Sequence, residues 1–181
     1  MIYRAHEVEI RGRKILLRSA AKEDAEQLLA YLKQTSGETP YLIREPDEVT
    51  LTLEQEISFI REKESAEREL MLLAFEGGNL IGSCSISSLG SCSRYAHRCD
   101  MAIALYQKYC GMGIGRLMVE TVLSEAKRAG YEQAELEVAS SNQSAVKLYE
   151  NLGFVKYGTL PDNMKYRDGT YEDCFWMMRK L

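Results

Sequence analysis

The 181-residue sequence has few of the residues that would build a metal centre or a disulfide framework. It contains two histidines, His6 and His97, and five cysteines, an odd number with no Cys-x-x-Cys pair. Because a zinc site needs about four such ligands at characteristic spacings, the sequence predicts no metal. We expect a reduced, cytoplasmic protein in which cysteines within strands act as small apolar residues.

Long apolar runs and an excess of positive charge are also lacking. No stretch approaches the roughly 18 apolar residues of a membrane helix, and the first residues, MIYRAHEVEIRGRK, carry charges throughout. The net charge is −4 and the isoelectric point about 5.4, which argues against a nucleic-acid surface. We therefore expect a single domain, 1–181, with a core of its own and neither membrane nor nucleic acid as partner.

Hydrophobic periodicity predicts about seven strands and about four helices. The strands are expected at 7–18, 70–75, 80–88, 95–105, 134–138, 155–160 and 171–178, and the helices at 22–34, 53–68, 114–129 and 142–152. Thr52 and Gln55 form a capping box for the second helix, whereas Gly37 and Pro40 should end the first in a turn. A hairpin turn is expected at 76–79 and a polar loop at 162–169. This order indicates an α/β (α+β) fold with a mixed, mostly antiparallel sheet.

A glycine-rich turn follows the apolar strand Met101–Leu105 and opens the third helix. It reads Cys110-Gly111-Met112-Gly113-Ile114-Gly115. Glycines where a strand feeds a helix let a ligand approach the backbone, and the free N–H groups of the first helical turn carry the helix dipole. This arrangement suits a pyrophosphate, although such a turn can also serve packing alone.

Two familiar phosphate motifs fit the turn poorly. A Walker loop ends in Gly-Lys-Ser/Thr, whereas this turn ends in Gly-Arg-Leu. The dinucleotide fingerprint G-x-G-x-x-G would use Gly111 and Gly113 but has Arg116 at its third position. An acidic residue about twenty positions further on exists, as Glu135 or Glu137, so this interpretation stays open as an alternative.

A third motif fits better. The Gln/Arg-x-x-Gly-x-Gly/Ala turn of the GCN5-related N-acetyltransferase (GNAT) superfamily matches at Gly113 and Gly115. The superfamily's later signature is also present, as Asn142, Ala145, Leu148-Tyr149 and Gly153-Phe154. Over nearly its whole length the chain resembles the bacterial branch with ribosomal-protein and small-amine acetyltransferases. One departure is Cys110, which occupies the usual Arg/Gln position and removes a side-chain contact to the cofactor phosphates.

The resemblance implies the GNAT fold, whose two central strands splay apart where acetyl-CoA enters. It also implies an N-acetyltransferase, in which a primary amine attacks the thioester of acetyl-CoA, the co-substrate, directly. The acceptor would be a small amine or a protein N-terminus. The implied cofactor-binding residues are Ile103, Leu105, Cys110, Gly111, Met112, Gly113, Ile114, Gly115, Arg116 and Asn142.

The resemblance further implies a general acid. Tyr149 would lie near the cofactor sulfur and protonate the departing thiolate, although from its helical position alone it would be a core aromatic residue. His97 and Asp100 resemble positions that this branch fills with histidine and an acidic residue, which makes them candidates for the general base. Strand alternation would place these two on opposite faces. Asn142 could instead only cap its helix.

Two further questions stay open in the sequence. Acceptor recognition is expected from the loop between the first two helices and from the final strands, although a solvated charged surface would have the same composition. The alternative to an enzyme is a non-catalytic acyl-CoA-binding sensor module, which Cys110 supports and Tyr149 opposes. Assembly as a homodimer is an open alternative to a monomer.

Overall fold

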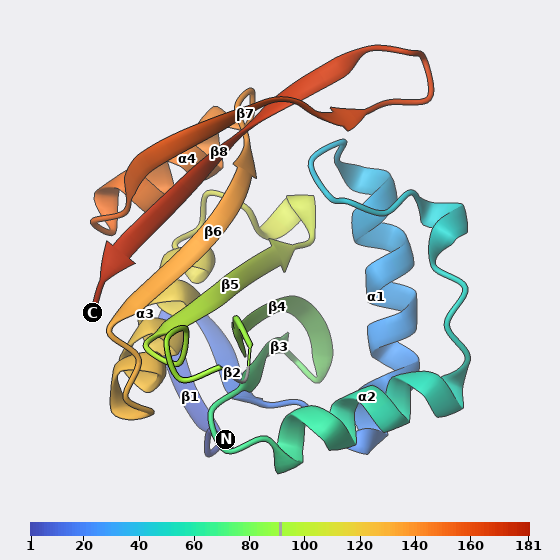
Figure 1. Ribbon diagram of the computed structural model, residues 1–181. Helices are drawn as coiled ribbons and strands as arrows, with labels where there is room; N and C mark the ends of the chain where they lie inside the picture. Colours follow the sequence, from blue (N-terminus) through green and yellow to red (C-terminus); the bar gives the residue numbers. More distant parts are fainter. Residues whose placement is uncertain (91) are drawn as a thin grey trace.

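The computed structural model describes residues 1–90 and 92–181, and an eight-stranded sheet forms its centre (Figure 1). The strand order is β1-β2-β3-β4-β5-β6-β8-β7, and within the described residues all neighbours are antiparallel except β5 and β6. The strands are β1 His6–Ile10, β2 Arg13–Ser19, β3 Leu70–Glu76, β4 Asn79–Ser88, β5 Arg98–Leu105, β6 Gln133–Ala139, β7 Val155–Lys165 and β8 Tyr171–Lys180. This mixed, mostly antiparallel sheet confirms the predicted fold class.

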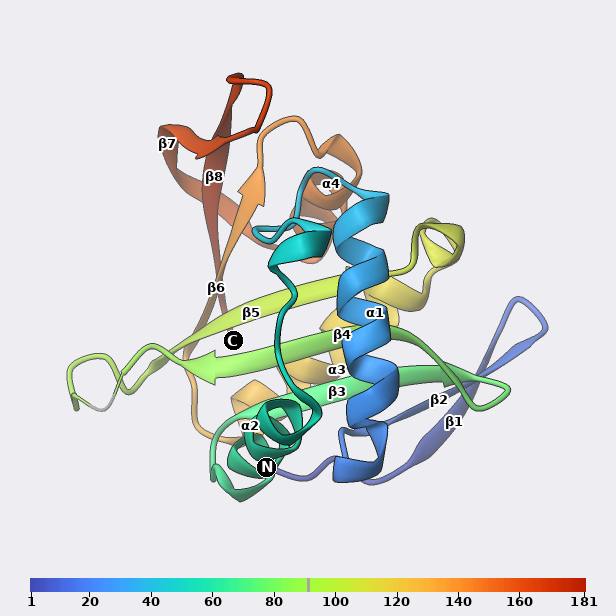
Figure 2. The same ribbon diagram turned by 90° about the vertical axis from the view of Figure 1, so that its right-hand side faces the viewer.

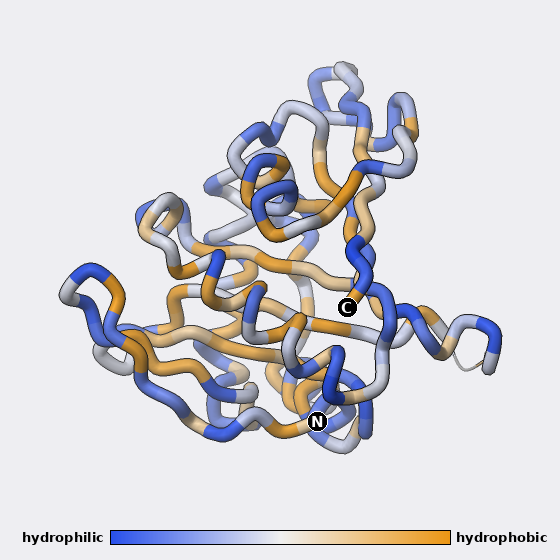
Figure 3. The backbone as a smooth tube through the Cα atoms, turned by 90° about the vertical axis from the view of Figure 1, so that its left-hand side faces the viewer, coloured by the Kyte–Doolittle hydropathy of each residue, from blue (hydrophilic) through white to orange (hydrophobic). Residues whose placement is uncertain are grey.

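The described residues form four α-helices, the number predicted, and these cover the two faces of the sheet (Figure 2). They are α1 Ala25–Glu38, α2 Leu53–Ser65, α3 Ile114–Arg128 and α4 Gln143–Asn151, with short 3-10 turns η1 Lys22–Asp24, η2 Pro46–Glu48 and η3 Gln107–Tyr109. α1 and α2 pack on one face around Leu28, Tyr31 and Ile60. The larger core lies on the other face, where α3 and α4 pack through residues such as Met118 and Val146. In Figure 3 the hydrophobic stretches follow the central strands, and the outer turns are hydrophilic.

The predicted strand 7–18 is wrong, because the chain turns back within it. β1 and β2 form a hairpin whose turn residues, Arg11 and Gly12, both have positive φ, 51° and 77°. Two-residue hairpin turns favour positive φ at both positions, and Asn-Gly or Asp-Gly is their usual signal. The pair Arg-Gly lacks that signal, so the sequence predicted seven strands where the structure has eight.

The end of the first helix was also mispredicted. α1 continues through Gly37 to Glu38, and a Cβ added to Gly37 would lie 3.3 Å from Pro46 Cγ. This glycine therefore allows η2 to approach the helix and does not stop it. In contrast, the capping box of α2 is confirmed, because the Gln55 N–H donates to Thr52 Oγ1 at 3.2 Å.

The remaining elements differ from the predictions mainly at their ends. β5 begins at Arg98 instead of at 95, and α2 ends at Ser65 instead of at 68. β7 extends to Lys165, into the predicted polar loop, through an irregular stretch after Leu160. All five cysteines are free thiols. None of the described helices is long and apolar enough to cross a membrane.

Candidate active site

The two central strands, β5 and β6, separate after a short paired segment (Figure 1). Their parallel pairing covers only Arg98–Asp100 of β5 and Gln133–Glu135 of β6. Beyond it β5 stays paired with β4 as far as Leu105, while β6 stays paired with β8 as far as Ala139. The predicted splay of the central strands is thus confirmed, and it leaves an opening inside the sheet.

The backbone of β5 has free hydrogen-bonding groups along this opening. The Gln133 N–H of the β6 segment donates to the His97 carbonyl at 3.1 Å, whereas the Tyr106 N–H donates to Ile81 of β4 at 3.1 Å. Because backbone groups alternate in direction along a strand, odd-numbered residues of β5 face β6 and even-numbered residues face β4. Ile103 and Leu105 therefore direct their N–H and C=O groups into the opening, where an extended ligand could pair with them.

The glycine turn lies between the end of β5 and α3. Gly111 and Gly113 have φ of 74° and 93°, a left-handed conformation that favours glycine, and Gly113 is the N-cap of α3. The hydrogen bonds of α3 begin with the Leu117 N–H donating to Gly113 at 3.1 Å. Within the described residues no N–H group from Gly111 to Arg116 donates to another group, so these donors are available to an anion at a helix N-terminus.

Gly115 has a different purpose from the two turn glycines. Its Cβ position lies 3.4 Å from Leu105 Cδ1 and 3.7 Å from Leu148 Cδ2. These are ordinary van der Waals distances, which show that α3 starts close to the end of β5. The N–H donors of the turn and the free edge of β5 are thereby held next to each other.

Cys110 is exposed and carries no positive charge into the turn. Its Sγ lies 3.8 Å from the carbonyl of Tyr106, to which the thiol donates. Desolvation first, and then the nearby Glu38 carboxylate, raise the pKa of the Cys110 thiol, so that it is neutral at pH 7. The turn therefore offers neutral backbone donors without a charged side chain at this position.

Tyr149 is a core residue of α4 whose hydroxyl is uncommitted. The side chain is 6% exposed, and its ring packs edge-on against Phe154 with centroids 5.8 Å apart. The hydroxyl makes no hydrogen bond within the described residues and is not sealed from solvent. Burial first, and then the Cys84 thiol, raise the pKa of Tyr149, which keeps its proton at neutral pH. The core interpretation is therefore correct for the ring, while the hydroxyl is free to donate.

Asn142 caps α4, as one interpretation of the sequence predicted. Its Oδ1 accepts the N–H of Ala145 at 3.2 Å. Its contact with the cofactor stays a prediction.

The two predicted base candidates lie at the paired end of β5. His97 precedes β5, so the strand alternation that would place its side chain opposite Asp100 does not apply to it. The six residues from His97 to Ile103 span about 20 Å when the chain is extended. Asp100 occupies the last paired position, opposite Glu135. Desolvation first, and then the carboxylates of Glu135 and Glu137, raise the pKa of Asp100. Of the two, Asp100 lies nearer to the opening.

Glu137, on β6, was missed as a candidate for acceptor chemistry. It lies beyond the paired segment on the same face as Glu135, opposite the apolar residues of the strand. Asn163 Nδ2 donates to its Oε1 at 2.6 Å, and Trp176 Nε1 donates to its Oε2 at 2.9 Å. Both oxygens keep acceptor capacity, so an oriented and exposed carboxylate stands at the edge of the opening.

Glu135 is, by contrast, already occupied. Arg98 binds it through Nε and, at 2.6 Å, through Nη2, while Gln133 Nε2 donates to it at 2.7 Å. This binding lowers the pKa of Glu135, with the Arg98 hydrogen bond as the main cause. The strand alternation that buries Ala134, Leu136 and Val138 could have placed both acids on the acceptor face. Their partners differ, because Glu135 is bound from β5 and β6, whereas Glu137 is bound from β7 and β8.

Two segments that were expected to recognise the acceptor meet at one end of the molecule. Arg167, in the β7–β8 loop, donates through Nη2 to Asp47 Oδ1 at 2.6 Å. Asp47 belongs to η2, in the connection between α1 and α2. Figure 1 shows these two segments side by side. Both segments lie near the C-terminal end of α1.

The family of the chain follows from comparison with known sequences. Residues 25–154 match the model of the Acetyltransferase (GNAT) family. The chain belongs to this family. The dinucleotide interpretation of the glycine turn is therefore wrong.

Curated relatives include bacterial N-acyltransferases of two kinds. The L-amino acid N-acyltransferase MnaT of Escherichia coli is 25% identical over 111 residues, which cover 61% of this chain and 64% of MnaT. The N-alpha-acetyltransferase RimI of Mycobacterium tuberculosis is 35% identical over 85 residues, 47% of this chain and 51% of RimI. Over 52 residues, 29% of this chain and 35% of the relative, the E. coli [ribosomal protein bS18]-alanine N-acetyltransferase is 40% identical. The matched regions thus span less than two thirds of these relatives.

Solved structures match over nearly the whole GNAT domain. A GNAT-family acetyltransferase from Streptococcus pneumoniae superimposes with a TM-score of 0.88 at 29% identity, over 92% of this chain and 99% of the other. The structure of yncA from Salmonella typhimurium, with its cofactor acetyl-CoA, has a TM-score of 0.81 at 18% identity, over 92% and 94% of the two chains. The second match shows a shared fold.

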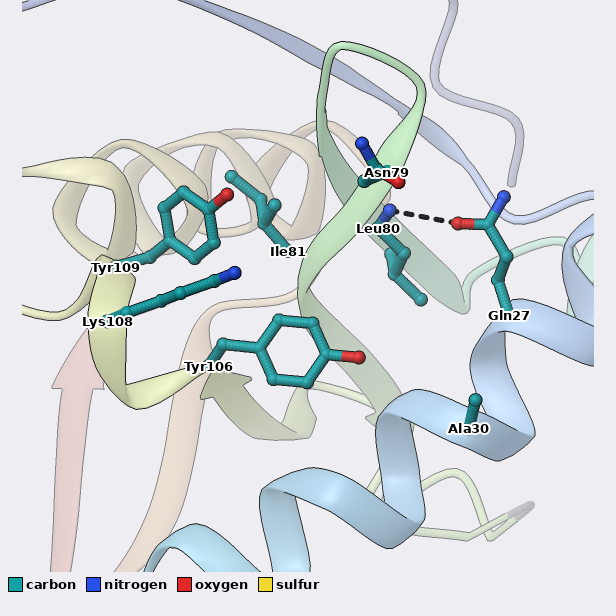
Figure 4. A pocket seen from close by; sticks show the side chains of 8 residues that line it. All are labelled: Gln27, Ala30, Asn79, Leu80, Ile81, Tyr106, Lys108 and Tyr109. Carbon is teal, nitrogen blue, oxygen red and sulfur yellow. Dashed lines mark hydrogen bonds between the residues drawn. The ribbon is translucent and has the colours of Figure 1, made fainter.

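The GNAT domain also has a cavity of about 440 Å³ on the other side of β5 (Figure 4). It lies between α1, the start of β4 and η3, and it is lined by residues that include Gln27, Tyr106 and Lys108. Figure 4 shows Gln27 bound to the N–H of Leu80, at 3.0 Å. None of the predicted cofactor or catalytic residues lines this cavity. Within the described residues no three His, Cys, Asp or Glu side chains are grouped to hold a metal ion.

Proposed function

We propose that the protein transfers the acetyl group of acetyl-CoA to the primary amine of a small metabolite or of a protein N-terminus. The observation that carries the proposal is the opening between β5 and β6, with free backbone groups and an oriented carboxylate along it. The relatives support both acceptor classes, since one is an L-amino acid N-acyltransferase and another acetylates an alanine of ribosomal protein bS18.

Acetyl-CoA would be held by backbone groups of two neighbouring segments. When bound, it supplies an activated acetyl thioester. Ile103 and Leu105 would pair with the amides of its extended arm, as an added strand pairs with a sheet edge. The N–H donors from Gly111 to Arg116 would bind its pyrophosphate. These groups fit the cofactor because they are unpaired in the described structure and adjacent to each other.

Glu137 is the group best placed to receive the acceptor amine. A primary amine is cationic at neutral pH and must lose a proton before it can attack a thioester. The Glu137 carboxylate would bind the ammonium group and take its proton, directly or through a water molecule. Asp100 adds a second carboxylate on the same face of the sheet. Glu137 replaces His97 in this role, because His97 lies at the paired end of the strands.

Tyr149 would protonate the departing thiolate. Its raised pKa keeps the phenol protonated at neutral pH, and its hydroxyl has no other partner within the described residues, so the proton is available to the departing sulfur. Packing of the ring against Phe154 fixes its orientation.

The decisive experiment measures thiol release over a panel of amino acids, small amines and N-terminal peptides, for the wild type and for Tyr149→Phe. With an accepted amine, we expect kcat of the variant to fall by roughly 10²–10⁴, with unchanged melting temperature and cofactor affinity. Tyr131→Phe is the matched control, because Tyr131 is also buried but lies beneath Arg68 beyond the end of α3. Equal kcat for both variants would refute the acid role of Tyr149.

The same panel separates an enzyme from a sensor. A protein that binds acetyl-CoA tightly but releases thiol with none of the amines would fit the non-catalytic acyl-CoA-binding module. Turnover of any amine well above the rate of hydrolysis without an acceptor would exclude that alternative.

A further inference from the structure

We propose that Arg11, at the tip of the β1–β2 hairpin, supplies the cationic contact to the cofactor pyrophosphate that Cys110 does not supply. The inference rests on the proposed function and names a further binding residue for the same site. It is drawn from the position of the hairpin against the glycine turn.

The hairpin tip lies next to the glycine turn although the two are far apart in sequence. Arg11 Nη1 lies 3.4 Å from the carbonyl oxygen of Gly111, to which it donates. A Cβ added to Gly113 would lie 3.8 Å from Cγ2 of Ile10, the residue before Arg11. Figure 2 shows the hairpin projecting at the same end of the sheet as the connection from β5 to α3. The guanidinium group thus lies beside the N–H donors of the turn.

Arg11 is uncommitted, whereas two other cations at this end have partners. Among residues 1–90 and 92–181, Arg11 forms no ion pair and is exposed to solvent. Arg116 contacts Glu120 at 3.4 Å, and Arg13 donates to Glu76 at 2.9 Å. A guanidinium has five N–H donors, so the single long bond to Gly111 leaves Arg11 able to bind phosphate oxygens.

The backbone conformation at Arg11 is a further indication that this side chain has a function. Its φ of 51° lies in the left-handed region, where Gly, Asn and Asp are the common residues. A long cationic side chain at such a position costs stability that a glycine would not, and residues in unfavourable conformations are concentrated at functional sites. The position of Arg11 over the turn accounts for that choice.

The test measures the affinity for coenzyme A by calorimetry, in Arg11→Gln and in Lys14→Gln. Lys14 belongs to the same hairpin and loses the same charge, but it is exposed, and its single ion pair among the described residues is with Glu7, at 3.5 Å. We expect the dissociation constant to rise about tenfold in Arg11→Gln, as for the loss of one charge-assisted hydrogen bond, and to stay unchanged in Lys14→Gln. The loss should shrink as salt is raised. Equal affinities for the two variants would overturn the proposal.

Two further measurements assign the contact. The loss should be the same with 3′-dephospho-coenzyme A, which keeps the pyrophosphate, and a loss seen only with coenzyme A would overturn the pyrophosphate assignment. Arg11→Gln should cost less in a Cys110→Arg background, because that arginine supplies the missing charge; an equal cost would show that Arg11 does not replace position 110. A wild type that fails to bind coenzyme A would refute the proposed function itself, and this inference with it.

Discussion

A tyrosine hydroxyl is built into the sheet between β4 and β5, and its removal is the sharpest test of the described site. Tyr31 on α1 donates to the carbonyl of Ala104 at 2.6 Å and accepts from the N–H of Ser83 at 3.2 Å. Its side chain is 1% exposed. In Tyr31→Phe both backbone groups would lose their partner at a buried position, next to the free edge of Ile103 and Leu105.

The magnitude follows from these two hydrogen bonds. An unsatisfied buried group costs about 1–3 kcal/mol, so the two together should lower the free energy of unfolding by about 2–6 kcal/mol. In a domain of this size each kcal/mol shifts the melting temperature by about 2–4 °C. We therefore expect Tyr31→Phe to melt roughly 4–24 °C below the wild type. Cofactor affinity should also fall, because Tyr31 helps to position β5.

Thermal unfolding followed by circular dichroism measures the effect, and Tyr106→Phe is the control. The Tyr106 ring packs edge-on against Tyr31 with centroids 5.1 Å apart, but its hydroxyl makes no hydrogen bond within the described residues. The control should therefore melt close to the wild type. If Tyr31→Phe melts within about 1 °C of the control, the backbone groups of Ser83 and Ala104 must pair directly once the hydroxyl is removed, and the predicted loss of stability is refuted.

Three further outcomes are expected. Gly113→Val should abolish coenzyme A binding in calorimetry, whereas Gly130→Ala, also at positive φ but at the far end of α3, should lower only the melting temperature. Glu137→Gln should reduce kcat/KM for an accepted amine by at least about tenfold without changing cofactor affinity, and unchanged kinetics would exclude its role. Arg98 lowers the pKa of Glu135, so this pair contributes its full stability above the pKa of Glu135 in the unfolded chain and loses it as pH falls through the lower folded pKa. Urea unfolding below about pH 4.5 should show this loss of stability. The variant Arg98→Gln lacks the pair and should not show the loss.

The part of the fold that the sequence predicted well is the part with strong local signals. From Met101 to Phe154, a strand, a glycine turn, two capped helices and an intervening strand each have a signature within a few residues. The two clear errors arose where tertiary structure overrides such signals. Arg11 and Gly12 form a hairpin turn without the usual residues, and Gly37 continues a helix because Pro46 packs against it.

The site shows the same division. The turn from Gly111 to Gly115 and the edge at Ile103 could be found from sequence, because they lie on one continuous segment. The proposed roles of Arg11 and Glu137 could not, since they depend on partners about 25 to 100 residues away that only the folded sheet brings into contact.

The opening between β5 and β6 also bears on aggregation. An unpaired strand edge normally invites a strand of another molecule, and proteins protect such edges with charges, proline, bulges or covering segments. The free edge of β5 lies inside the sheet and faces β6, with which β5 is paired at three positions before the two strands diverge. A neighbouring protein cannot add a strand to it without entering this wedge. The chain can therefore keep an unsatisfied edge for a slender ligand without the risk of polymerisation that an outer edge would bring.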